Sequence, residues 1–271
     1  MRQPQTIRLQ QDEWAIHDQL ATNSTAQRFY TSVYHGDMPS DDRVIVTCIR
    51  LGDADNTLKV HIKERLQTLK MLNEVSVAPI LDYDVQDNIV YVVREQPDNT
   101  LADLLQRGNH AYGEAIALFN RLCEAVKTIH EQGVLHLNLT PDNILFHDDG
   151  VLLADFALYD IPTRIIYGTP SYLAPEQLRG EAMGMFTDVY ALGLILYEML
   201  TGTSAIDNTP YSTPHAIIQA QLTMPPVPPS THNPALSPAL DVVLMRVLEK
   251  APKKRYQTVA PLQEALQHAL S

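Results

Sequence analysis

The stretch His136-Leu137-Asn138-Leu139-Thr140-Pro141-Asp142-Asn143-Ile144-Leu145 decides the fold of this chain. Upstream of it, residues 115–132 carry apolar side chains at helical spacing, and Gly133 is the type of residue that closes a helix. Downstream, residues 151–154 predict a short strand that ends just before Asp155-Phe156-Ala157, and Ala174-Pro175-Glu176 follows. The polar motifs therefore lie in the segments that connect regular elements.

Composition describes an ordinary globular chain. It has 271 residues, of which 45% are hydrophobic and 19% charged, enough to bury a sizeable core. A net charge of -12 argues against nucleic acid or an anionic membrane as the main partner. No apolar run reaches the ~18 residues of a membrane span, so no membrane insertion is expected. The polar N-terminus has no signal-peptide core, which predicts a cytoplasmic location.

The two cysteines, Cys48 and Cys123, lie 75 positions apart. That spacing fits neither a disulfide framework nor a metal site. Both have apolar neighbours in the sequence, so we expect them in the core.

The first third of the chain predicts strands and one helix. A turn is expected at 36–42 and a helix with a leucine face at 56–73. Strands are expected at 14–21, 29–34, 43–51, 77–84 and 88–94.

After residues 95–99 the pattern changes to helical periods. Helices are expected at 101–106, 115–132, from 187 onward, 213–222, 236–248 and 259–270. The fold class is therefore α+β. We expect a single domain over 1–271 with two lobes, at 12–96 and 97–271.

Taken together, the order and spacing of these motifs resemble a protein kinase, and bacterial Hanks-type serine/threonine kinases in particular. The resemblance implies a small lobe of antiparallel sheet plus one helix, a hinge near 95–99, and a mainly α-helical large lobe. It also implies packing roles for five residues, with Glu176 paired to Arg255 and Asp188 anchoring the loop. These five residues are His136, Phe156, Glu176, Asp188 and Arg255.

The loop departs from the family pattern at three positions. Asn138 stands where the family has its catalytic aspartate, and an amide cannot accept a proton. Thr140 replaces a lysine that contacts the transferred phosphate, and Leu137 replaces an arginine that receives the activation-segment phosphate. In addition, the stretch 20–30, where the family has a glycine-rich phosphate loop, contains no glycine.

The lysine that holds the phosphates in this family is also missing. Two registers fit the strand at 43–51, one placing Thr47 at the lysine position and the other placing Arg50 there. The glutamate that pairs with this lysine falls at Arg65, with Glu64 one residue away. If Glu64 holds the position, it could pair with Arg50.

Two positions keep the residues that hold magnesium in the family, namely Asn143 and Asp155. They leave open an atypical or weakly active serine/threonine kinase that uses Mg-ATP, with Arg50 as the cation for the phosphates.

The sum of the losses favours a pseudokinase, a regulatory or protein-binding module that is not an enzyme and requires no cofactor. A ligand-free structural interaction domain is a further alternative. A protein partner is expected, and the first surfaces to consider are the helices at 56–73 and 213–222.

Overall fold

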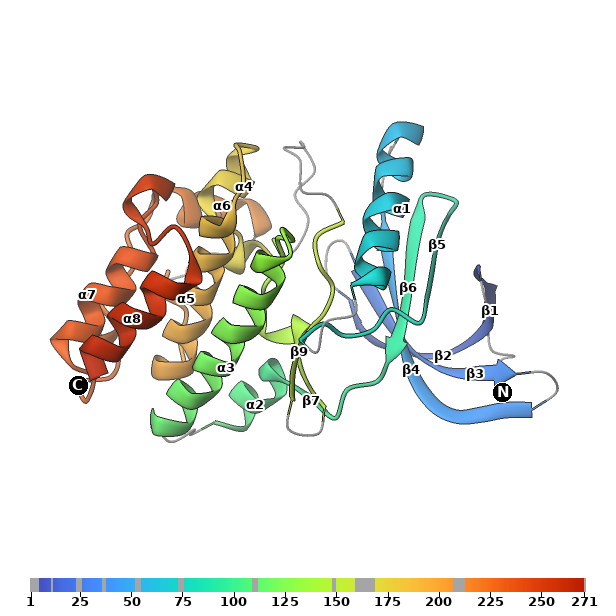
Figure 1. Cartoon of the computed structure of the whole chain (residues 1–271), viewed down its shortest axis with the longest axis horizontal. Coiled ribbons are helices and arrows are strands. Elements are labelled where there is room, and N and C mark those ends of the chain that lie inside the picture. Colours follow the sequence, from blue (N-terminus) through green and yellow to red (C-terminus); the bar gives the residue numbers. More distant parts are fainter. Residues whose placement is uncertain are drawn as a thin grey trace. The chain divides into compact units, whose positions relative to one another are not determined.

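The structure is a computed structural model that describes residues 5–10, 12–22, 26–35, 38–51, 55–72, 76–108, 112–147, 150–158, 169–206 and 213–270. The chain forms two compact units, Met1–Asp98 and Asn99–Ser271 (Figure 1). The predicted α+β class is confirmed, with an antiparallel sheet and one long helix in the first unit and mainly helices in the second. The lobe limits expected at 12–96 and 97–271 stay a prediction.

The first unit is built on a six-stranded sheet with the order β1-β2-β3-β4-β6-β5, in which all neighbours are antiparallel. Its long central strand contains the β-branched run that favours extended backbone. The strands are β1 Gln5–Arg8, β2 Glu13–Thr22, β3 Ala26–His35, β4 Met38–Arg50, β5 Asp82–Gln86 and β6 Ile89–Glu95.

Two strand boundaries differ from expectation. The turn expected at 36–42 is wrong from residue 38 onward, because Met38 and Pro39 pair with His35 and Tyr34 and so extend β4. β5 begins at Asp82 instead of residue 77, since Pro79 has no N–H with which to join a ladder.

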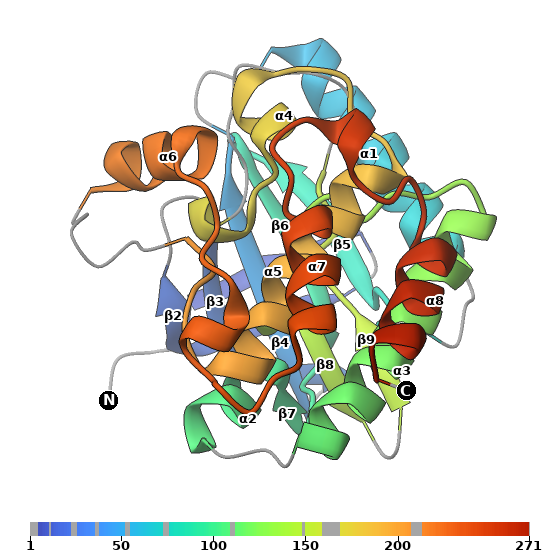
Figure 2. The same ribbon diagram turned by 90° about the vertical axis from the view of Figure 1, so that its left-hand side faces the viewer.

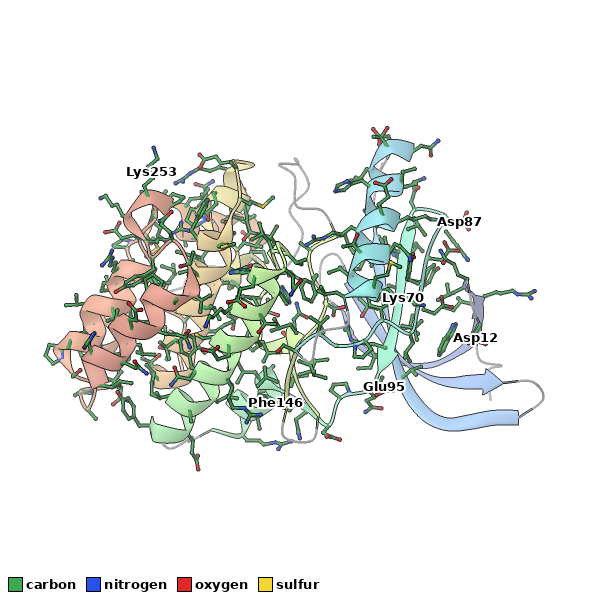
Figure 3. The ribbon with its side chains drawn as sticks, in the orientation of Figure 1. Asp12, Lys70, Asp87, Glu95, Phe146 and Lys253 are labelled. Carbon is green, nitrogen blue, oxygen red and sulfur yellow. The ribbon has the colours of Figure 1, made fainter. Side chains whose placement is uncertain are left out.

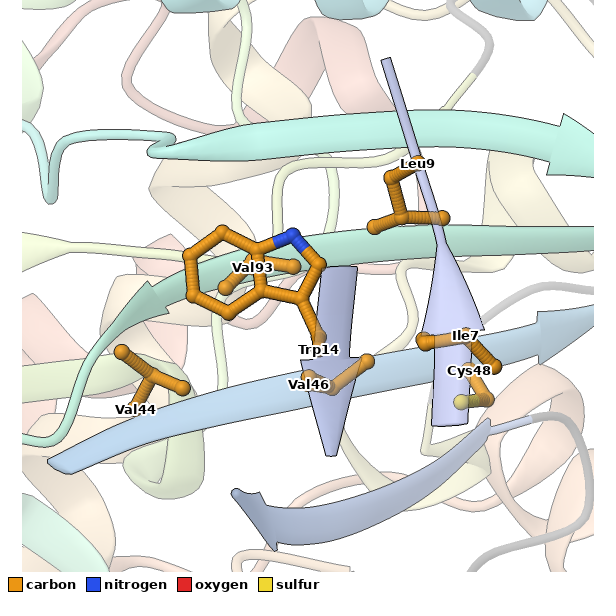
Figure 4. Close-up of a cluster of buried hydrophobic side chains, with 7 residues drawn as sticks. All are labelled: Ile7, Leu9, Trp14, Val44, Val46, Cys48 and Val93. Atoms are coloured by element: carbon orange, nitrogen blue, oxygen red, sulfur yellow. The ribbon is translucent and has the colours of Figure 1, made fainter. Parts of the chain in front are cut away.

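One face of this sheet carries an apolar cluster centred on Trp14 (Figure 4). Alternate residues of a strand point to opposite faces, which is why Val44, Val46 and Cys48 of β4 all join the cluster. The indole Nε1 of Trp14 donates to Asp82 Oδ2 at 3.2 Å, which satisfies its polar end. The other members are Ile7, Leu9, Val44, Val46, Cys48 and Val93.

The helix α1, Asn56–Met71, covers the opposite face of the sheet. Asp55 caps its start by accepting a hydrogen bond from Leu58 N at 2.8 Å. Near its end, Lys70 donates to Leu81 O at 2.6 Å and so ties the helix to the segment before β5 (Figure 3).

The second unit packs its helices around α5, Met185–Thr201, which is buried along most of its length. Helix α3 packs against α5 and α8, and α7 packs against the same two helices (Figure 2). The helices are α2 Leu101–Arg107, α3 Tyr112–Glu131, α4 Pro175–Arg179, α6 Pro214–Thr223, α7 Pro238–Val247 and α8 Val259–Leu270.

A small three-stranded sheet completes the second unit. Its order is β7-β8-β9, with β7 at Asn99–Thr100, β8 at Ile144–His147 and β9 at Gly150–Leu153. The sequence did not predict β1, β7, β8 or α4. Each has five residues or fewer, too short for a periodic pattern.

Both cysteines lie in the core, as expected, and they form no disulfide. Burial raises the pKa of the Cys48 thiol to about 12, so it stays protonated and unreactive.

A buried ion pair joins α4 to the segment before α8. Arg255 Nη1 and Nη2 donate to the two carboxylate oxygens of Glu176, each at 2.8 Å. Arg255 Nε also donates to Glu249 O at 2.6 Å, and its guanidinium lies over the Tyr190 ring at 4.5 Å. With both side chains fully buried, each charge depends on the other for compensation.

We predict that Glu176→Gln lowers the free energy of unfolding by about 3–5 kcal/mol, because it leaves the buried Arg255 charge unpaired. Glu181→Gln is the control. Glu181 lies 4.0 Å from Arg179 at the surface, and its loss should change stability by at most about 0.5 kcal/mol. Urea unfolding measures both variants, and equal effects would contradict the prediction.

Replacing each of two helical glycines by alanine should change the stability of the chain in opposite directions. A Cβ at Gly193 on α5 would lie 2.4 Å from Val247 Cγ1 on α7, whereas a Cβ at Gly113 on α3 meets nothing within 4 Å. Gly193→Ala should destabilise the chain by about 1–3 kcal/mol through overpacking. Gly113→Ala should stabilise it by about 0.5–1 kcal/mol through helix propensity. Thermal unfolding would refute this if both changes had the same sign.

Candidate functional site

The loop at 136–145 is held by one buried carboxylate from the first turn of α5. Asp188 Oδ2 accepts the backbone N–H of His136 at 2.9 Å, and Oδ1 accepts that of Leu137 at 2.7 Å. Two successive amides therefore point at one side chain 51 and 52 positions away. This anchors the start of the loop to the most buried helix of the unit.

His130 at the end of α3 is the third group on Asp188. Its Nε2 lies 2.8 Å from Asp188 Oδ2, and both side chains are buried. Burial by itself would raise the pKa of Asp188, but the hydrogen bond and charge of His130 and the contacts with His136 hold it below its ordinary value. Asp188 is thus an ionised acceptor at neutral pH. Sequence analysis missed His130, which reads as one more residue on the buried face of a helix.

Leu137 adopts the left-handed conformation, with φ of +60°, and its side chain is buried. For a branched residue this costs about 1–3 kcal/mol unless the surroundings enforce it. The bonds to Asp188 enforce it from one side. From the other, Gln177 Nε2 on α4 donates to Leu137 O at 2.8 Å. Gln177 was not predicted, because nothing in the sequence marks a support residue on so short a helix.

Asn138 and Asn143 are joined within the loop. Asn143 Nδ2 donates to Asn138 O at 2.8 Å, and Asn143 N donates to Thr140 O at 3.0 Å. Asn138, Thr140 and Asn143 are all buried. Asn138 and Thr140, which depart from the family motif, therefore form one compact turn with Asn143, which keeps it.

Asp155 lies beside this turn. Ala154 N donates to Asn143 O at 3.0 Å, and Asn138 Nδ2 donates to Asp155 O at 2.6 Å. Asp155 itself has φ of +53° and is half-buried. The structure thus brings Asn138, Asn143 and Asp155 together.

Phe156 packs on the loop from the same side. Its ring stacks on His136 with centroids 4.2 Å apart and an interplanar angle of 26°. Ala157 N donates to His136 O at 2.9 Å, which fixes the backbone after the stack. Residues 159–168, including Thr163 and Gly168, lie outside the described part of the chain.

The segment after that gap is tied to α6. Gln221 on α6 donates to Ser171 O and accepts from the Tyr190 hydroxyl at 3.1 Å. The helix α6, expected as an interaction surface, therefore also supports the neighbouring residues 170–172.

In the first unit, Thr47 lies on the face of the sheet that α1 covers. Directly paired residues of neighbouring strands share a face, and Thr47 pairs with Val92, which pairs with Tyr83. The Tyr83 hydroxyl donates to Gln67 on α1. Thr47 is buried, and its hydroxyl accepts a hydrogen bond from Arg94 Nη2 at 3.2 Å.

Arg50 lies elsewhere. It is an odd number of residues from Thr47, so it points to the other face of β4, and it is exposed. Glu64 is also exposed on α1, whereas Arg65 is buried. No ion pair between Glu64 and Arg50 occurs among the described residues. The phosphate-loop stretch is described in part: Ala21 and Thr22 belong to β2 and Ala26 begins β3, while residues 23–25 are not described.

Within the described ranges, no helix is both long and apolar enough to cross a bilayer.

Comparison with known proteins identifies the family of this chain. The sequence pattern of the protein kinase domain matches residues 30–271, and the chain belongs to the protein kinase domain family. Its relatives are bacterial Hanks-type serine/threonine-protein kinases. Pkn1 of Myxococcus xanthus is 32% identical over 226 residues, covering 79% of this chain and 32% of the relative. PknB of Mycolicibacterium smegmatis is 32% identical over 228 residues, covering 78% of this chain and 36% of the relative.

The chain thus spans about a third of the length of these relatives. Among solved structures, the kinase domain of Mycobacterium tuberculosis PknI is 20% identical and aligns with a TM-score of 0.73. The match covers 95% of this chain and 96% of that domain, which supports the two-lobed kinase fold.

The prediction that the chain is not an enzyme is wrong. Relatives that are 30–32% identical over most of this chain are named serine/threonine-protein kinases. That prediction was based on the individual substitutions at the motif positions. The loop geometry, however, depends on backbone amides and Asp188, which those substitutions leave in place.

We predict that Asp188→Asn lowers the free energy of unfolding by about 2–4 kcal/mol at pH 7, because an amide oxygen is a weaker acceptor than a carboxylate. The folded pKa of Asp188 is lowered, so its stabilisation is complete above the unfolded pKa of ~4 and is lost as pH falls through the folded value. The difference between wild type and variant should therefore shrink below pH ~4. Urea unfolding at pH 7 and pH 3 measures it, and a pH-independent difference would contradict the assignment.

Proposed function

We propose that this chain is an atypical serine/threonine-protein kinase domain that transfers a phosphoryl group from Mg-ATP to a hydroxyl of a protein substrate. The observation that carries the proposal is the intact frame of the loop. Asp188 accepts hydrogen bonds from the first two backbone amides of the loop. The Asn143 side chain donates to Asn138 O, and Ala154 N donates to Asn143 O. The family membership and the relatives named as kinases support it.

Asn143 and Asp155 are the candidate metal ligands. The Asn143 amide uses its Nδ2 on Asn138 O, so the oxygen is the atom that it can present to a metal. Asp155 supplies a carboxylate that is half-buried and adjoins Asn143 through Ala154. Amide and carboxylate oxygens suit Mg²⁺, so the donor set fits. Bound magnesium would neutralise charge on the phosphates during transfer.

Asn138 can orient a hydroxyl but cannot take its proton. Its Nδ2 donates to Asp155 O at 2.6 Å, so its amide oxygen is the atom with which it could accept a hydrogen bond from a hydroxyl. Phosphoryl transfer passes through a loose transition state, in which positioning and electrostatics supply most of the acceleration. Losing the general base costs about 10²–10⁴ in rate. We therefore propose a slow kinase.

Leu137 shapes the regulation of this activity. Leu137 is apolar and buried where the family has a phosphate-receiving arginine. We propose that phosphorylation of the segment 157–173 does not switch this kinase by the family's usual ion pair. The partner is a protein substrate, and a cytoplasmic location remains our expectation.

We predict that purified protein transfers radiolabel from ATP to a protein substrate in the presence of magnesium, and that Asp155→Ala abolishes the transfer. Asn138→Asp should raise the rate by about 10²–10⁴, because it restores a proton acceptor. Asp241→Asn is the control. The Asp241 carboxylate accepts hydrogen bonds from the backbone N–H and the hydroxyl of Ser230, and both residues are remote in sequence from the loop at 136–145. Absence of magnesium-dependent transfer by the wild type would overturn the proposal.

A further inference from the structure

The first unit holds a buried cation beside Thr47, which is one of the two candidate positions for the family's strand lysine. Thr47 and Arg94 are 1% and 4% exposed, and Arg94 Nη2 reaches Thr47 Oγ1 at 3.2 Å. Arg94 is the residue before Glu95, and Glu95 ends β6 (Figure 3). The guanidinium is always charged at physiological pH, so the charge persists in this buried position.

The pairing of strands explains how Arg94 reaches this place. Arg94 pairs directly with Ile45, and Ile45 and Thr47 lie on the same face of β4. Arg94 and Thr47 are therefore diagonal neighbours across two strands, a separation that a long side chain spans. The Thr47 hydroxyl provides an acceptor for one of the guanidinium N–H groups.

This face is also the one that α1 covers. Thr47 pairs with Val92, and Val92 pairs with Tyr83, whose hydroxyl contacts α1. Arg94 therefore shares the face of Thr47, while Arg50 is exposed on the opposite face. The sequence-based alternative, in which Arg50 supplies the cation, is thus less consistent with the fold than Arg94.

We infer that Arg94 binds phosphate oxygens of the nucleotide and replaces the missing strand lysine from the neighbouring strand. A guanidinium donates two parallel N–H groups, which suits a phosphate better than a single ammonium does. The ligand class is a nucleoside triphosphate, recognised here through its phosphate chain. This assignment rests on the proposed function, because the nucleotide is the phosphoryl donor of the proposed reaction.

Binding of three probes to the full chain tests the assignment: Mg-ATP, tripolyphosphate and adenosine. Arg94→Met should weaken Mg-ATP and tripolyphosphate binding about 10-fold to 100-fold, the range for hydrogen bonds to a charged group. Adenosine binding should change by less than about 2-fold, because it has no phosphate. Arg50→Met is the matched control and should change none of the three.

A second variant moves the charge back to its family position. Thr47→Lys combined with Arg94→Met places a lysine on β4 and an apolar side chain on β6, and it should recover most of the Mg-ATP affinity lost in Arg94→Met alone. This variant also keeps the test decisive if Arg94→Met folds poorly, which far-UV circular dichroism would show. A purely structural role for Arg94 predicts equal losses for ATP and adenosine, and that result would overturn the inference.

The outcomes separate this inference from the proposed function. If wild type transfers phosphate and Arg94→Met binds Mg-ATP normally, the role of Arg94 is refuted and the kinase proposal stands. If Mg-ATP binding depends on Arg94 but no phosphoryl transfer occurs, the kinase proposal fails and the role of Arg94 stands. If wild type binds neither Mg-ATP nor tripolyphosphate, both are refuted.

Discussion

The carboxylate of Asp188 organises the second unit by accepting two consecutive backbone amides from a loop more than 50 positions away. His130 supplies a third contact, and together these groups hold the pKa of Asp188 low despite its burial. Because both amides point at one side chain, Leu137 takes a left-handed conformation that its own side chain disfavours. The course of the loop from Asn138 to Asn143 follows from that constraint.

The interactions that position this loop are separate from those that do chemistry. Asn143 Nδ2 donates to the backbone carbonyl of Asn138, and Ala154 N donates to the backbone carbonyl of Asn143. The His136 ring stacks on Phe156. None of these contacts requires an aspartate at 138 or a lysine at 140. A substitution at a reactive position can therefore lower the rate without disturbing the frame. For this reason the residue types at motif positions did not reveal whether the chain is an enzyme.

Charge placement in the first unit depends on the faces of the sheet. Thr47 and Arg50 were both candidates for one position, and strand alternation assigns them to opposite faces. The cation that lies beside Thr47 comes from β6, some 47 positions along the chain. A missing charge in one strand of a sheet can thus be replaced by a long side chain on its neighbour.

The sequence by itself determined the order of strands and helices, the kinase motifs and their spacing, and the pairing of Glu176 with Arg255 as an expectation, because periodicity and motif spacing are local properties. Only the tertiary structure decided the short strands β1, β7 and β8, the support given by His130 and Gln177, and the approach of Arg94 to Thr47. These features depend on partners far apart in the chain. The role of each of these residues depends on the strand or helix that it contacts, and a local sequence pattern does not contain that information.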